Sequence, residues 1–262
     1  MLIIITSNKP QNNINDGYGD AYTEAFFSKA ESLTEQGILA SGYGDHLKAS
    51  SLYLRAACLY RIARFPYITS FPTINSETKL RVWEAQKAVY MRAATGWEFP
   101  VKQVMITHTA ANGKDRDTIP VYVRLPKCTE AWKEKVPVVL LITGLDGYRP
   151  DNAHIINEFI VRGWGCVIVE IPGTADCPID PSDPKGLDRL WMSILDWMEG
   201  EGTFEMHKVM VWRLSCGGYY AARVAHTHRD RLRRSVAQGA ASHHFFGHKW
   251  IDYADSHEYP FS

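Results

Sequence analysis

One stretch of sequence, from Val209 to Ala222, constrains the fold of this chain more than any other. An apolar run leads directly to Ser215, which two glycines and a helix-forming segment follow. A buried strand, a tight turn centred on a serine and a helix, in this order, are the setting that a nucleophile elbow requires. Such a turn strains the backbone of the serine, so its neighbours must be small, and Gly217 meets that need. The stretch therefore predicts that Ser215 is a catalytic nucleophile at the end of a strand.

Arg213 departs from the pattern of such an elbow. The G-x-S-x-G motif has glycine two positions before the serine, whereas this chain has arginine there. We expect the large side chain to crowd the turn or to displace the neighbouring strand. The elbow either tolerates it with the side chain turned outward or is damaged by it. The alternative interpretation of the whole stretch is that Ser215 only caps a helix that follows a buried strand.

A second loop fits the same chemistry. Residues 143–148 follow an apolar strand predicted over residues 136–142. In an α/β-hydrolase this loop supplies one backbone N–H group to the oxyanion, and the residue after the nucleophile supplies the other. The predicted donors are therefore Leu145 and Cys216. Asp146 either orients a hydroxyl group of the substrate or is an ordinary turn residue, because Asp-Gly is a common turn pair.

The first hundred residues have a helical pattern. Apolar residues recur at helical spacing over residues 20–35 and 46–63, and a third helix is predicted to begin after Ser76. Aromatic side chains in this region are more typical of a core than of a substrate platform. We predict an N-terminal helical cap domain over residues 1–99.

Strands replace this pattern after Pro100. A hairpin is predicted around the turn pair Asn112-Gly113, and strands and helices then alternate, which is typical of a mostly parallel sheet flanked by helices. We predict that residues 100–262 form an α/β-hydrolase core. The predicted strands cover residues 101–107, 119–125, 136–142, 166–171, 209–212 and 235–238, and the predicted helices cover residues 151–162, 187–198 and 217–225.

Composition argues against several classes of function. Lys plus Arg and Asp plus Glu both number 29, so the formal net charge is zero. A nucleic-acid or membrane-surface partner normally needs a basic face, and we expect neither. No apolar run approaches the ~18 residues of a transmembrane helix. The five cysteines are scattered without a C-x-x-C pair. We expect a soluble, cytoplasmic protein.

The histidine pairs do not predict a metal site. Neither His226 with His228 nor His243 with His244 has a carboxylate at ligand spacing, and the H-E-x-x-H motif is absent from the sequence. His243 and His244 do follow the last predicted strand, at the sheet end where ligands of parallel sheets bind. A role for these two side chains in the substrate pocket is a weak hypothesis.

The residues around Ser215 resemble a known family. Leu214 to Arg223, followed by histidines at positions 226 and 228, resembles the fungal yellowish-green pigment-pathway hydrolases, which shorten heptaketides on the way to melanin. Segments 53–61, 143–149 and 239–246 resemble the same proteins. The wider group includes the 2,6-dihydroxypseudooxynicotine hydrolases, which break a carbon–carbon bond next to a ketone. The resemblance covers roughly residues 17–262.

This resemblance implies an α/β-hydrolase whose N-terminal helical domain covers the active site, with no metal and no organic cofactor. It implies that Ser215 attacks a ketone of a small-molecule polyketide substrate and that water releases the acyl-enzyme. A homodimer is left open. Two other functions remain: an esterase or thioesterase that uses the same elbow, and a catalytically inactive remnant.

The remaining members of a catalytic triad are not evident. In this fold the acid and then the histidine follow the nucleophile along the chain. Asp252, Asp255 and His257 are poor candidates, because their segment resembles one that lies between two strands in the family. We expect that this chain lacks the acid, the base and the last strands, as in a truncated gene product or a fragment.

Overall fold

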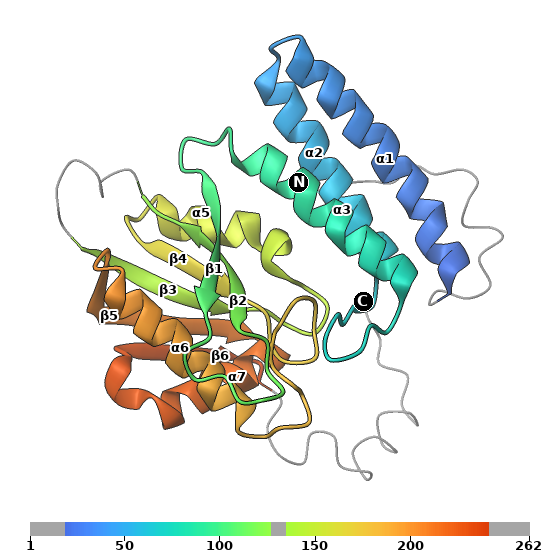
Figure 1. Cartoon of the computed structure of the whole chain (residues 1–262). Coiled ribbons are helices and arrows are strands. Elements are labelled where there is room, and N and C mark those ends of the chain that lie inside the picture. The colour runs from blue at the N-terminus through green and yellow to red at the C-terminus, as the bar shows by residue number, and fades with distance from the viewer. Residues whose placement is uncertain (1–18, 127–134, 241–262) are drawn as a thin grey trace.

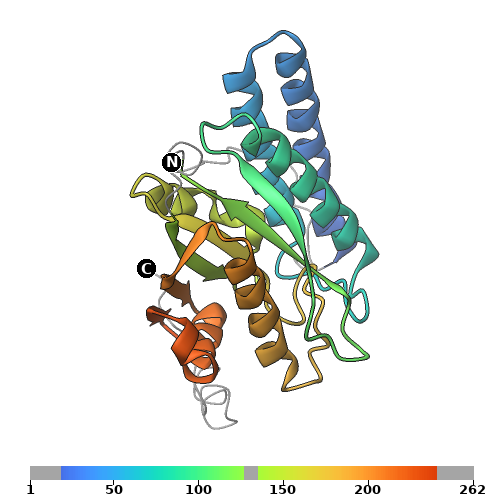
Figure 2. The ribbon, with the colours of Figure 1, turned by 60° about the vertical axis from the view of Figure 1, so that its left-hand side comes forward.

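The structure, a computed structural model, describes residues 19–126 and 135–240. A single twisted sheet forms the centre of the described part, and the three N-terminal helices lie along one side of it (Figures 1 and 2). No helix in these residues is both long enough and apolar enough to span a membrane.

The N-terminal helices begin where their sequence provides caps. They are α1 (Asp20–Gly42), α2 (His46–Ala63) and α3 (Glu77–Ala94). The Asp45 side chain accepts a hydrogen bond from the Lys48 N–H group at the start of α2, and Ser76 accepts one from Lys79 at the start of α3. Each cap satisfies a backbone donor that has no partner within its helix. The predicted bounds of α2 are confirmed, whereas α1 runs further than predicted.

The sheet has the strand order β1-β2-β4-β3-β5-β6. The strands are β1 (Val101–Thr107), β2 (Thr118–Arg124), β3 (Val136–Ile142), β4 (Gly165–Val169), β5 (Phe204–Leu214) and β6 (Arg234–Gln238). The pairs β1–β2 and β2–β4 are antiparallel, and the other three pairs are parallel. A hairpin leading into a mostly parallel, helix-flanked sheet is the predicted arrangement. The α/β-hydrolase fold class is confirmed.

The connections between the parallel strands carry the other helices. They are the 3₁₀ helix η2 (Arg149–Asn152), α5 (Ala153–Ile160), α6 (Gly186–Gly200), α7 (Cys216–Thr227) and the 3₁₀ helix η3 (Arg229–Arg231). The prediction for β5 was too short, because Glu205, His207 and Lys208 interrupt the apolar pattern. The pairing of β5 with β3 is also irregular here: Val136 pairs with Phe204, whereas Val138 pairs with Val209.

Strand β3 shows how the sheet is buried on both faces. Its alternate residues point to opposite sides. Val139 and Leu141 join a buried cluster with α1–α3 and α5, whereas Val138 and Leu140 join a second cluster with α6 and α7. The N-terminal helices thus share one core with a face of the sheet. The division into domains at residues 99 and 100 stays a prediction.

Candidate functional site

Ser215 lies at the predicted junction between a strand and a helix. β5 ends at Leu214 and α7 begins at Cys216, with Ser215 between them at φ 58° and ψ −137°. A positive φ is unfavourable for a residue with a Cβ atom and costs on the order of 1–3 kcal/mol, so such strain is found mainly at functional sites. The Ser215 side chain is exposed and caps no N–H group of α7. The alternative of a simple helix-capping serine is therefore not supported by this geometry.

The elbow is held closed by two backbone hydrogen bonds. The Ser215 N–H group donates to the carbonyl oxygen of Gln238 at the end of β6, at 2.9 Å. The Gly218 N–H group donates to the carbonyl oxygen of Ser215, also at 2.9 Å. These two bonds tie Ser215 to β6 on one side and to the first turn of α7 on the other.

The glycine at position 217 is required by close packing. A Cβ atom there would lie 2.2 Å from Arg213 Cγ and 2.5 Å from the carbonyl oxygen of Thr143, which is closer than such contacts occur. Thr143 is the first residue of the loop of residues 143–148 that follows β3, which we call the oxyanion loop after its predicted role. The structure therefore brings the two predicted parts of the site, the elbow and this loop, into contact.

Arg213 is accommodated in a way that the sequence did not predict. Its pairing with Ala237 in β6 is regular, so the strand is not displaced. The side chain does not turn outward either. It passes Gly217, reaches the oxyanion loop and donates a hydrogen bond from Nη1 to Asn152 Oδ1, while Nη2 lies 3.6 Å from the position of a Cβ atom on Gly147. Burial lowers the pKa of Arg213, although Asp151 and Asp146 act in the opposite direction.

Leu145, one of the two predicted oxyanion donors, lies in the oxyanion loop. It is 50% exposed, and within the described part of the chain its N–H group has no hydrogen-bond acceptor. Cys216 is the first residue of α7, where a backbone N–H group has no partner within the helix. A helix N-terminus also favours negative charge. The assignment of these two N–H groups to an oxyanion hole stays a prediction.

A buried arginine at the C-cap of α2 holds the oxyanion loop in place. The Arg64 guanidinium group donates to the carbonyl oxygen of Asp146 at 3.1 Å and to Asp151 Oδ2 at 2.5 Å. It also donates to Gln86 Oε1 at 2.6 Å and lies 4.0 Å from the ring centre of Tyr148. Beyond the place of Arg64 at the end of a predicted helix, nothing in the sequence pointed to this role. Its contacts make the helical region a structural support of the candidate site.

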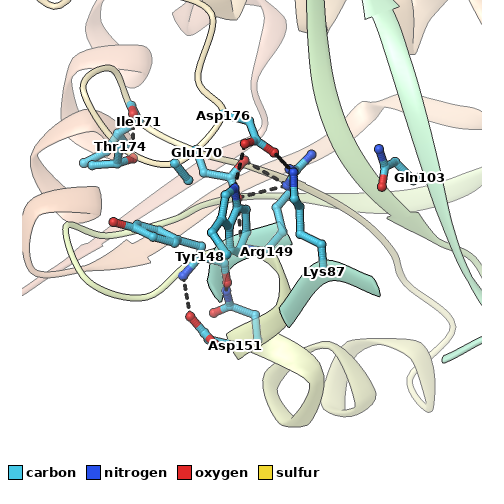
Figure 3. Close-up of polar contacts among 12 residues, drawn as sticks. Lys87, Gln103, Tyr148, Arg149, Asp151, Glu170, Ile171, Thr174 and Asp176 are labelled. Atoms are coloured by element: carbon cyan, nitrogen blue, oxygen red, sulfur yellow. Dashed lines mark hydrogen bonds and ion pairs between the residues drawn. The ribbon is translucent and has the colours of Figure 1, made fainter. Parts of the chain in front are cut away.

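A second buried network fixes the end of the same loop (Figure 3). Arg149 donates from Nε to Glu170 Oε1 at 2.9 Å and from Nη2 to Asp176 Oδ2 at 2.6 Å. Lys87 of α3 donates to the same oxygen of Asp176 at 2.9 Å. Burial raises the pKa of Glu170 to about 7, although Arg149 acts in the opposite direction. This network links the helical region to the end of β4.

Other predicted site residues divide into two groups. The Asp146 side chain is exposed, and its Oδ2 lies 3.8 Å from Arg61 Nη2. His243 and His244 lie outside the described residues, as do Asp252, Asp255 and His257. Among the described residues, no group of three histidine, cysteine, aspartate or glutamate side chains could hold a metal ion.

Solved structures support the fold. A structure of the 2,6-dihydroxy-pseudo-oxynicotine hydrolase aligns with a TM-score of 0.70 at 20% identity, over 97% of this chain and 65% of that chain. A structure of AbyA5 aligns with a TM-score of 0.58 at 21% identity, over 86% of this chain and 56% of that chain. This chain thus spans less than two thirds of the length of either protein.

The family is identified from the sequence. No curated protein matches the chain. A family model described as "Esterase FrsA-like" matches residues 32–253, which include the helices α2 and α3, the whole described sheet and the elbow. The match covers most of the chain, and the fold agrees with it. This protein belongs to the FrsA-like esterase family, whose members are hydrolases of the α/β-hydrolase fold.

Proposed function

We propose that this protein is a serine-dependent hydrolase that cleaves a carbon–carbon bond next to a ketone, with Ser215 as the nucleophile and a polyketide as the substrate. The observation that carries the proposal is the strained, exposed backbone position of Ser215 between β5 and α7. The resemblance of segment 214–223 to the pigment-pathway hydrolases supports the substrate class.

The reaction has two steps. Ser215 Oγ adds to the ketone carbon as its hydroxyl proton is removed by a base, a role that we assign to none of the described residues, and the carbonyl oxygen becomes an oxyanion. The carbon–carbon bond then breaks, and its electron pair leaves on the carbon next to a second carbonyl group, which delocalises it as an enolate. Protonation of the enolate gives a shortened ketone. Water hydrolyses the remaining acyl-serine to a carboxylic acid and restores the hydroxyl group.

The oxyanion is the species that this site is suited to stabilise. In the proposal, the N–H groups of Leu145 and Cys216 donate to it in the transition state, where loss of one such donor costs about 10²–10³-fold in rate. Contact between Gly217 and Thr143 supports this arrangement, because it brings the oxyanion loop to the start of α7. Asp146 is proposed to orient a hydroxyl group of the substrate.

Ester hydrolysis is the second candidate function, and the match to an esterase family favours it. The same nucleophile and the same oxyanion donors serve both reactions, because each passes through an acyl-serine. The two reactions differ in the leaving group, which is an alkoxide in an ester and an enolate in a β-diketone.

Product analysis distinguishes these functions. The protein is incubated separately with 1-phenyl-1,3-butanedione and with phenyl butanoate, and products are identified by mass spectrometry. The proposal expects benzoate plus acetone, or acetophenone plus acetate, from the diketone, and loss of these products in Ser215→Ala. Turnover of the ester alone favours the esterase. Cleavage that persists in Ser215→Ala contradicts both.

A further inference from the structure

We propose that Arg213, together with Arg61, binds a carboxylate group of the substrate beside the candidate nucleophile. This inference rests on the proposed function, because it names the kind of substrate that the same site accepts. It starts from the residue that departs from the elbow pattern. An arginine in place of a glycine adds a positive charge two residues before Ser215.

Two guanidinium groups from distant parts of the chain meet at the oxyanion loop. A Cβ atom on Gly147 would lie 3.6 Å from Arg213 Nη2 and 3.7 Å from Arg61 Nη2. Arg213 comes from the end of β5, whereas Arg61 comes from the last turn of α2. Like charges repel at this range, so an anion between or beside them is favoured.

The nearby carboxylates do not neutralise this pair fully. Asp151 is already bound by the buried Arg64 at 2.5 Å, and it also accepts from Gln86 at 2.6 Å. The distances from Arg61 to Asp146 and Asp151 are long, at 3.8 and 3.7 Å. The three arginines 61, 64 and 213 therefore face two aspartates, which leaves one excess positive charge among these described residues.

Arg213 itself has only a neutral partner. Its hydrogen bond goes to the amide oxygen of Asn152, and its Nε atom is buried with no hydrogen-bond acceptor among the described residues. A buried donor without an acceptor costs about 1–3 kcal/mol. The planar edge of a guanidinium group matches the two oxygens of a carboxylate. A carboxylate that binds Nη2 of Arg213, beside Gly147, would supply the missing negative charge.

The exposed side chains around Arg61 and Arg213 allow a ligand to approach the two arginines from solvent. The Arg61 side chain is 42% exposed and that of Asp146 is 53% exposed. Ser215 and Leu145 are exposed as well. In the proposal, a keto acid contacts Arg61 from solvent while its carbonyl group lies toward Ser215.

The test measures binding rather than turnover. Isothermal titration calorimetry compares 5-oxo-5-phenylpentanoate with its uncharged methyl ester, and the full chain carries Ser215→Ala so that neither ligand is consumed. In this background we compare Arg213→Gly, Arg61→Gln and, as a control, Arg162→Gln. Arg162 is an exposed arginine that follows α5 and pairs with Glu158.

The proposal expects the keto acid to bind about 10–100-fold more tightly than the ester, as for a charge-assisted hydrogen bond. Arg213→Gly removes this preference, Arg61→Gln reduces it, and Arg162→Gln leaves it unchanged. If Arg213→Gly does not fold, as circular dichroism would show, the half-exposed Arg61 decides the result. Equal binding of acid and ester, no binding of the acid, or a preference that survives both substitutions overturns the proposal. Labelling of Ser215 by a fluorophosphonate in the otherwise unchanged chain tests the proposed function separately.

Discussion

Arg213 and Gly217 are in contact across the elbow, with the arginine side chain occupying the space next to the glycine. A Cβ atom on Gly217 would lie 2.2 Å from Arg213 Cγ. Arg213, at the first motif position, thus joins Thr143 in leaving room only for glycine at position 217, the last motif position. The arginine that departs from the motif and the glycine that keeps to it are therefore in direct contact.

Substitution of Gly217 by alanine is expected to lower the free energy of unfolding by about 1–3 kcal/mol, because the added methyl group overpacks the turn. Urea denaturation measures this loss. In the double variant, Arg213→Gly should restore part of the lost stability, because it removes one of the two close contacts. The other part of the loss should remain, because the added methyl group still meets the carbonyl oxygen of Thr143. Gly96→Ala is the control, since nothing lies within 4 Å of a Cβ atom there. Equal effects of the two alanine substitutions would contradict the close packing.

Arg64→Met is expected to destabilise the protein by about 3–5 kcal/mol, because it leaves the nearly buried carboxylate of Asp151 without its shortest ion pair. The exposed Arg55 of α2, the helix that Arg64 follows, provides the matched control, Arg55→Met. Urea unfolding of both variants gives the comparison. A loss below about 1 kcal/mol in Arg64→Met would show that the buried pair is not what holds the oxyanion loop.

The raised pKa of Glu170 predicts that the stability of the protein depends on pH. Burial raises its pKa to about 7, above the ~4.3 expected for the unfolded chain. The folded protein therefore binds more protons than the unfolded chain between these values, so the contribution of Glu170 to stability falls as pH rises from about 4.5 to about 7. Glu170→Gln removes this dependence. Urea unfolding at pH 5 and pH 7.5 should show the wild type losing stability relative to this variant; a constant or opposite difference would refute the assignment.

Much of the fold was predictable because its signals are local. The apolar run of β3 and the N-cap residue Ser76 each mark an element by their own sequence. The start of β5 was missed because Lys208, directly after His207, breaks the alternation of apolar and polar residues. The junction that holds Ser215 was predictable for the same reason as β3, since a strand, a serine, two glycines and a helix are consecutive in the chain.

The surroundings of the site were not predictable, because they depend on contacts between distant segments. Arg64 lies 82 positions before Asp146, whose carbonyl oxygen it binds. The path of Arg213 to Asn152 joins residues 61 positions apart. Neither contact follows from the spacing of residue types, since the folded chain brings α2, η2 and β5 together. Sequence alone therefore predicted that Arg213 could crowd the turn, as it does at Gly217, but not that its side chain reaches Asn152.

The most direct test of Ser215 as the nucleophile is its reaction with a fluorophosphonate probe. The chain and its Ser215→Ala variant are incubated with excess probe, and the modified residue is identified by peptide mass spectrometry. We predict a single phosphonyl adduct on Ser215, formed slowly where no base activates the serine, and none in the variant, whose fold is checked by circular dichroism. An adduct on another residue, or equal labelling of both proteins, would contradict the elbow assignment.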